Sequence, residues 1–131
     1  MSPVLVGAVS GLVLGATTSF LITGHLFHPF QKKTPATWRP ESWRQHVLAL
    51  LFHLVAGAGV GWLYAMSGAP TIGSSLLELT AAIWLVVASC LLIHALYVNW
   101  HPGFVLGIVI DWAVFVFVAL LACARFARAA T

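Results

Sequence analysis

Charged residues are scarce in this sequence. Among its 131 residues there are six lysines and arginines and three aspartates and glutamates, which together make up 7% of the chain. Soluble domains carry roughly 25% charged residues. Nine charged side chains cannot cover a globule of this size, and the mean hydropathy is +1.00. These values exclude a water-soluble protein and predict that the lipid bilayer surrounds most of the chain.

Several functional classes are excluded by what else is missing. Two cysteines are too few for a disulfide-rich secreted scaffold. The six basic residues form no extended patch, so nucleic acid is not an expected partner. The sequence contains no recognisable set of nucleophile, base and orienting residue and no phosphate-binding loop. We therefore expect a protein without enzymatic activity and assign no catalytic residue.

Four long hydrophobic runs dominate the sequence. They cover residues 4–27, 43–64, 76–98 and 104–123, and proline and glycine lie in the connections between them. About 20 apolar residues are needed to cross a bilayer core as a helix. The runs lack the alternation that is typical of membrane strands. The sequence thus predicts an all-α membrane protein in which four antiparallel transmembrane helices form one bundle and one domain, residues 1–131.

The basic residues predict an orientation, because lysine and arginine near helix ends favour the cytoplasmic side. Four of them lie in or beside the first connection and two near the C-terminus: Lys32, Lys33, Arg39 and Arg44, against Arg125 and Arg128. We expect a multi-pass membrane protein with the first connection, residues 28–42, in the cytoplasm and both termini outside.

Glycines recur at helical spacing in the first two runs. Those in the first run are four residues apart, and so are two in the second; they are Gly7, Gly11, Gly15, Gly57 and Gly61. Such spacing places small residues on one face and lets two membrane helices approach closely. The first and second helices are expected to pack against each other through these faces. Alternatively, the faces mediate a homo-oligomer or docking to a larger membrane complex.

The chain is rich in histidine, and all six fall in or beyond the half of the bilayer nearest the first connection. They are His25, His28, His46, His53, His94 and His101. Four lie near the interface, where imidazole is well solvated: His25, His28, His46 and His101. His53 lies deeper, and because it follows His46 by seven residues the two share one helix face.

Asp111 is the one acidic residue that falls deep inside a predicted span. A carboxylate in hydrocarbon is costly, so its presence indicates a functional site with a specific partner. We expect that partner to be His53 and, as a second choice, His94. The contact would either hold two helices together or serve transport, redox chemistry or ligand binding.

The histidines also allow a cofactor hypothesis. His46 and His94 lie at similar depth on different predicted helices, as the two axial ligands of a b-type haem would. A transition-metal site would draw on His46, His53, His94 and Asp111, although their spacing matches no compact metal motif.

Features along the whole chain resemble those of a group of small four-span bacterial inner-membrane proteins of unknown function. They are the glycine-rich first span with GLVLG at residues 11–15, the aromatic and proline-containing segment HLFHPF at residues 25–30, Trp38, and Asp111 in the last span. The resemblance implies a bacterial inner-membrane location and no known activity.

Three functional hypotheses follow. The leading one is a non-enzymatic membrane protein that acts as an accessory subunit of a complex or as a small homo-oligomer. The first alternative is a proton-linked transporter or ion-binding protein centred on Asp111 and His53. The second is a haem or metal protein that uses His46 and His94.

Overall fold

The computed structural model describes residues 1–33 and 42–127, apart from the side chain of Tyr97. Trp38, Arg39 and Arg128, together with most of the predicted cytoplasmic connection, lie outside these ranges. The described chain is helical and forms a bundle of four helices long and apolar enough to cross a membrane. The predicted fold class is confirmed.

The first membrane helix runs from Pro3 to Gln31 and changes its winding along its length. Three α-helical segments, α1 (Pro3–Ser10), α2 (Ala16–Ser19) and α3 (His28–Gln31), alternate with two π-helical segments, η1 (Gly11–Gly15) and η2 (Phe20–Phe27). Stretches of π-helix are rare and frequently mark functional sites.

The other three helices are regular: α4 (Trp43–Met66), α5 (Ser74–Tyr97) and α6 (Pro102–Phe126). Local signals fix where two of them start. Ser42 and Gln45 form a reciprocal capping box, in which the Ser42 N–H donates to Gln45 Oε1 at 2.8 Å. At α6, His101 Nδ1 accepts from the Gly103 N–H at 3.1 Å, and Pro102 occupies the first helical turn. The helices begin and end within four residues of the predicted spans.

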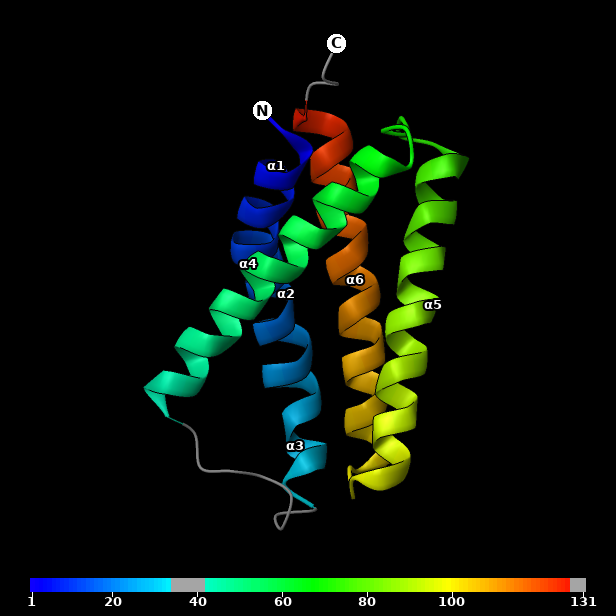
Figure 1. The fold of residues 1–131 in the computed structure, drawn as a ribbon. Coiled ribbons are helices and arrows are strands. Elements are labelled where there is room, and N and C mark those ends of the chain that lie inside the picture. Colours follow the sequence, from blue (N-terminus) through cyan, green and yellow to red (C-terminus); the bar gives the residue numbers. More distant parts are fainter. Residues whose placement is uncertain (34–41, 128–131) are drawn as a thin grey trace.

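Helix α6 occupies the centre of the bundle and is the most buried of the four, whereas α5 is the least buried. The segments of the first membrane helix and α4 pack on α6, and α5 packs chiefly against α6. One hydrogen bond joins α5 and α6: the Trp84 indole N–H donates to the Val109 carbonyl at 2.9 Å. The N-terminus and the C-terminal end of α6 lie at one end of the bundle, opposite α3 and the start of α4 (Figure 1).

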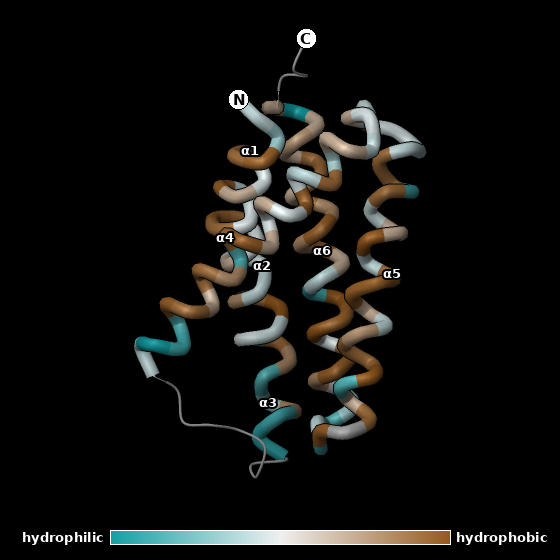
Figure 2. The backbone as a smooth tube through the Cα atoms, viewed as in Figure 1, coloured by the Kyte–Doolittle hydropathy of each residue, from teal (hydrophilic) through white to brown (hydrophobic). Residues whose placement is uncertain are grey.

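Helix α4 crosses the bundle obliquely (Figure 1). Its C-terminal end lies close to α1 and α6, and its N-terminal end diverges from η2 and α3. Hydrophobic residues cover the helices along most of their length, while hydrophilic residues gather in α3 and at the start of α4 (Figure 2). At the end that holds the N-terminus α4 packs closely on α1, and at the other it lies apart from η2; we call these the closed end and the open end of the bundle.

Candidate functional site

The glycine faces meet at the closed end. A Cβ atom added at Gly7 would collide with the Gly57 carbonyl oxygen, and one added at Gly57 would lie 2.8 Å from the Gly11 Cα. A Cβ at Gly61 would lie 2.8 Å from the Pro3 carbonyl carbon. The backbones of α1 and α4 thus touch directly, and these glycines pack two helices of the same chain.

Gly15 serves a different neighbour. A Cβ atom there would overlap the ring of Phe115 on α6 and lie 3.6 Å from His53 Cδ2. The His53 ring in turn packs edge-on against Phe115, with 5.7 Å between centroids. The absence of a side chain at Gly15 therefore makes room for the Phe115 ring, against which the imidazole packs.

Asp111 lies in this region and is buried, with 6% of its surface exposed. Its Oδ2 atom accepts two hydrogen bonds from the first helix, from Ser19 Oγ at 2.7 Å and from Thr23 Oγ1 at 2.9 Å. Ser19 and Thr23 are four residues apart and share a face. Its other oxygen, Oδ1, is buried and has no hydrogen-bond partner among the described residues.

His53 reaches Asp111 through Ser19. The distance from His53 Nε2 to Ser19 Oγ is 2.9 Å, and His53 Nδ1 lies 2.7 Å from the Ala49 carbonyl oxygen. A carbonyl only accepts, so Nδ1 carries a proton. The sequence predicted His53 as the first partner of Asp111. In the structure the Ser19 hydroxyl lies between the two side chains.

The number of protons available to these hydrogen bonds limits the charge states of Asp111 and His53. The Ser19 hydroxyl has one proton and cannot donate to both Asp111 Oδ2 and His53 Nε2. If it donates to an ionised Asp111, then Nε2 must donate to Ser19 and His53 is an imidazolium. If Asp111 is protonated and donates to Ser19, then Ser19 donates to a neutral His53. Both arrangements satisfy every bond, and in both the pair of side chains holds one shared proton.

The cluster lies in the wall of a cavity of about 770 Å³ between the first helix, α4 and α6. Aromatic side chains form much of the remaining wall: Phe20, Trp100, Phe104, Trp112 and Phe115. His28 and His46 line it toward the open end. Pockets of this volume, mostly apolar with a few convergent polar groups, are typical ligand sites.

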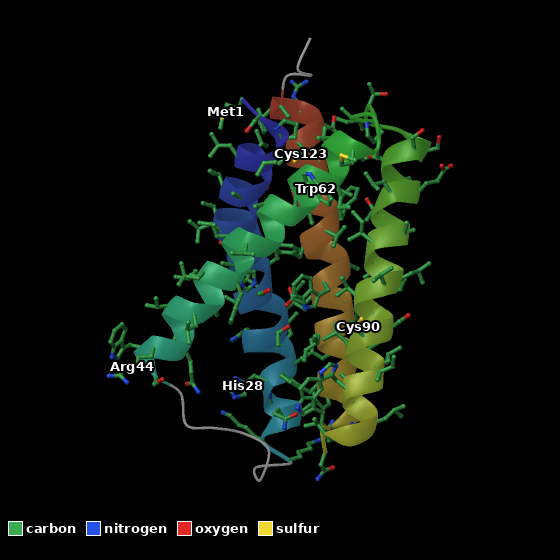
Figure 3. The ribbon with its side chains drawn as sticks, in the orientation of Figure 1. Met1, His28, Arg44, Trp62, Cys90 and Cys123 are labelled. Carbon is green, nitrogen blue, oxygen red and sulfur yellow. The ribbon has the colours of Figure 1, made fainter. Side chains whose placement is uncertain are left out.

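His94 does not join the cluster. It lies on the exposed surface of α5, where its Nδ1 donates to the Cys90 carbonyl at 3.0 Å. The start of α4, marked by Arg44, and Cys90 on α5 lie on opposite sides of the bundle (Figure 3). His46 and His94 are therefore not brought together as a pair of axial ligands.

The other predicted site residues do not gather into one site either. Within the described residues, no three histidine, cysteine, aspartate or glutamate side chains gather into a group that could hold a metal ion. His25 is exposed on η2, and the His101 ring packs against Phe30, with 5.3 Å between centroids. Of the predicted polar site, the structure brings together Asp111 and His53, with His46 in the same cavity wall.

Sequence reasoning missed Ser19 and Thr23. Hydroxyl groups in membrane helices commonly donate to a carbonyl one turn back, as Thr17 does to Val13 at 2.6 Å. Spacing alone offers no signal that separates Thr17 from its neighbours Ser19 and Thr23. Only the relative rotation of the first helix and α6 decides which hydroxyl meets the carboxylate.

Comparison of the chain with protein-family models, curated proteins and solved structures found no match.

Proposed function

We propose that this protein binds a small, partly apolar molecule within the membrane, and that binding is linked to the proton shared by Asp111 and His53. The observation that carries the proposal is the buried Asp111 carboxyl in the cavity wall, with Oδ2 held by Ser19 and Thr23 and Oδ1 unpartnered among the described residues. A buried polar atom without a partner is costly, and a ligand would relieve that cost. Proton-linked transport is the activity that such a site would serve.

A serine, a histidine and an aspartate in contact raise the question of hydrolysis, and we infer a non-enzymatic role. In a catalytic triad the carboxylate binds the histidine, and free N–H groups stabilise the oxyanion. Here the carboxylate binds Ser19 and a carbonyl takes His53 Nδ1. Ser19 lies within a continuous helix, and the N–H of Phe20 already donates to Ala16 and Thr17.

Association with other membrane subunits receives less support from the geometry. The glycine faces that favoured an oligomer or an accessory subunit are occupied by contacts between α1 and α4. The apolar outer surfaces of α4 and α5 suit the bilayer itself.

We further propose that the protein lies in a bacterial inner membrane with both termini outside. Support comes from the family resemblance and from Lys32, Lys33 and Arg44 at the end opposite the termini, against Arg125 at the other. Cysteines introduced by Lys33→Cys and Ser67→Cys should react with an impermeant maleimide from the cytoplasm and from outside, respectively. The reverse pattern would overturn the orientation.

The site is tested with dicyclohexylcarbodiimide, an uncharged apolar reagent that modifies protonated carboxyl groups. In the full chain in lipid bilayers, mass spectrometry should find Asp111 modified, and Asp111→Asn should abolish that adduct. Exposed Glu78 serves as the internal reference for a solvated acid. Modification of Glu78 with none at Asp111 would contradict the proposal.

A second experiment tests the cavity by filling it with a side chain. Gly24 lines the cavity, and a Cβ added there meets only ordinary contacts, the nearest at 3.7 Å. Gly24→Phe should therefore block modification of Asp111 without unfolding the protein. Gly59→Phe is the matched control, because a Cβ at Gly59 meets nothing within 4 Å and Gly59 is outside the cavity wall. Equal modification in both variants would show that the cavity is not the route to Asp111.

A further inference from the structure

The charge balance of the cavity restricts what it binds. Among the described residues of its wall, Asp111 is the one carboxylate, and lysine and arginine are absent. An anionic ligand would meet no fixed positive charge and would be repelled whenever Asp111 is ionised. A ligand with a positive charge would meet one buried carboxylate oxygen that lacks a partner.

The aromatic wall of the cavity also favours a ligand with a positive charge. Five aromatic side chains line the cavity, and aromatic faces attract organic cations, most strongly where water is excluded. The cavity opens between α4 and η2, where Phe20 and Leu50 are exposed on the side that a bilayer would cover. A ligand that enters from this side must carry apolar groups around its charge.

We propose that the ligand is an apolar organic cation, of the ammonium or phosphonium type, that binds at Asp111 in exchange for the proton shared by Asp111 and His53. This inference rests on the proposed function and adds the ligand class and the stoichiometry.

The exchange balances in charge and in hydrogen bonds. Before binding, the pair holds one proton and is neutral overall. After binding, the cation neutralises the Asp111 carboxylate, the shared proton leaves to the solvent, and His53 is neutral. Ser19 then donates to His53 Nε2, Thr23 still donates to Oδ2, and Nδ1 still donates to Ala49. Ser19 no longer donates to Asp111, and the positive charge of the cation compensates the carboxylate instead.

The experiment uses the full chain in nanodiscs and a pair of probes with the same shape and opposite charge, tetraphenylphosphonium and tetraphenylborate. Isothermal titration calorimetry in buffers of different ionisation enthalpy reports both affinity and proton release. We expect tetraphenylphosphonium to bind and to release about one proton, so that its apparent Kd falls about tenfold per pH unit while the pair is protonated. Tetraphenylborate should bind at least about thirtyfold more weakly.

Variants distinguish proton release at Asp111 and His53 from proton release by other titratable groups. His28 and His46 line the same cavity, and on α5 His94 and Glu78 are exposed. Proton release from the site should persist in His46→Gln and His28→Gln. Asp111→Asn should weaken cation binding at least about thirtyfold, whereas Glu78→Gln should leave it unchanged. If Asp111→Asn proves unstable, Asp111→Glu is used instead. This variant keeps the charge and should retain cation binding.

The outcomes separate the two proposals. Equal affinity for both probes, or cation binding without proton release from about pH 6 to about pH 9, would overturn the cation exchange. If an uncharged probe protects Asp111 from the carbodiimide and the phosphonium does not, the cavity is a ligand site of another class. If no probe binds and Asp111 is never modified, the proposed function itself fails.

Discussion

The contact between the first membrane helix and α4 differs between its two ends. At the end that holds the termini, Gly7, Gly11, Gly57 and Gly61 bring the two backbones together. At the other end α4 diverges, and Ser19, Thr23, His53 and Asp111 lie beside a cavity of about 770 Å³. The tight contact at one end fixes the angle of α4, and that angle keeps the polar end open. The close helix packing and the candidate site thus lie in different halves of one helix pair.

The tight half should be the more sensitive to added volume. In Gly57→Leu the new side chain meets the backbone of Gly7 and Gly11, which cannot move aside without separating the helices. We expect a loss of about 3 kcal/mol in the free energy of unfolding, measured in mixed detergent micelles. Gly59→Leu is the control, since a Cβ there meets nothing within 4 Å. A similar loss in both variants would show that the glycine contact does not fix α4.

In the polar half the largest effect is expected from Ser19→Ala. This change removes the hydroxyl that bridges His53 Nε2 and Asp111 Oδ2. Both groups lose a partner, and we expect a loss of about 1–2 kcal/mol in the free energy of unfolding. Ser89→Ala, on the exposed surface of α5, provides the matched control. Unfolding midpoints that coincide for the two variants would contradict the bridge.

Thr23→Val should have the smallest effect of the three. It removes one of the two donors to Asp111 Oδ2 and keeps the shape of the side chain, and Ser19 still holds the carboxyl. An average hydrogen bond between membrane helices contributes about 0.6 kcal/mol. Thr17→Val is the reference, because its hydroxyl donates only to the Val13 carbonyl on its own helix. A Thr23→Val loss as large as that of Ser19→Ala would give Thr23 the central position instead.

Most of the fold follows from the sequence, because hydrophobic length and helix stop signals decide where membrane helices lie. The four spans were predicted to within four residues, and the short ends that differ, such as His28–Gln31 of the first helix and Pro102–Gly103 of α6, depend on local winding and capping. The glycine spacing also indicated which faces of the first and second helices would meet.

The candidate site was predicted only in part. Asp111 and His53 were identified because a carboxylate and an imidazole are rare at this depth in a membrane. The second-choice partner His94 lies on the exposed surface of α5, because the rotation of α5 about its axis turns that residue away from the bundle. Helix rotation and the π-helical winding of η2 depend on packing between distant segments, which hydropathy along one segment does not encode.

The central claim is that Asp111 and His53 share one proton through Ser19. The most direct test records the side-chain carboxyl carbon of Asp111 and the ring nitrogens of His53 by solid-state NMR, across a pH titration of the full chain in bilayers. We predict that both sets of signals change together in one step that takes up or releases one proton, and that Ser19→Ala splits this step into two. Two independent steps in the unmodified protein, unaltered by Ser19→Ala, would contradict the account.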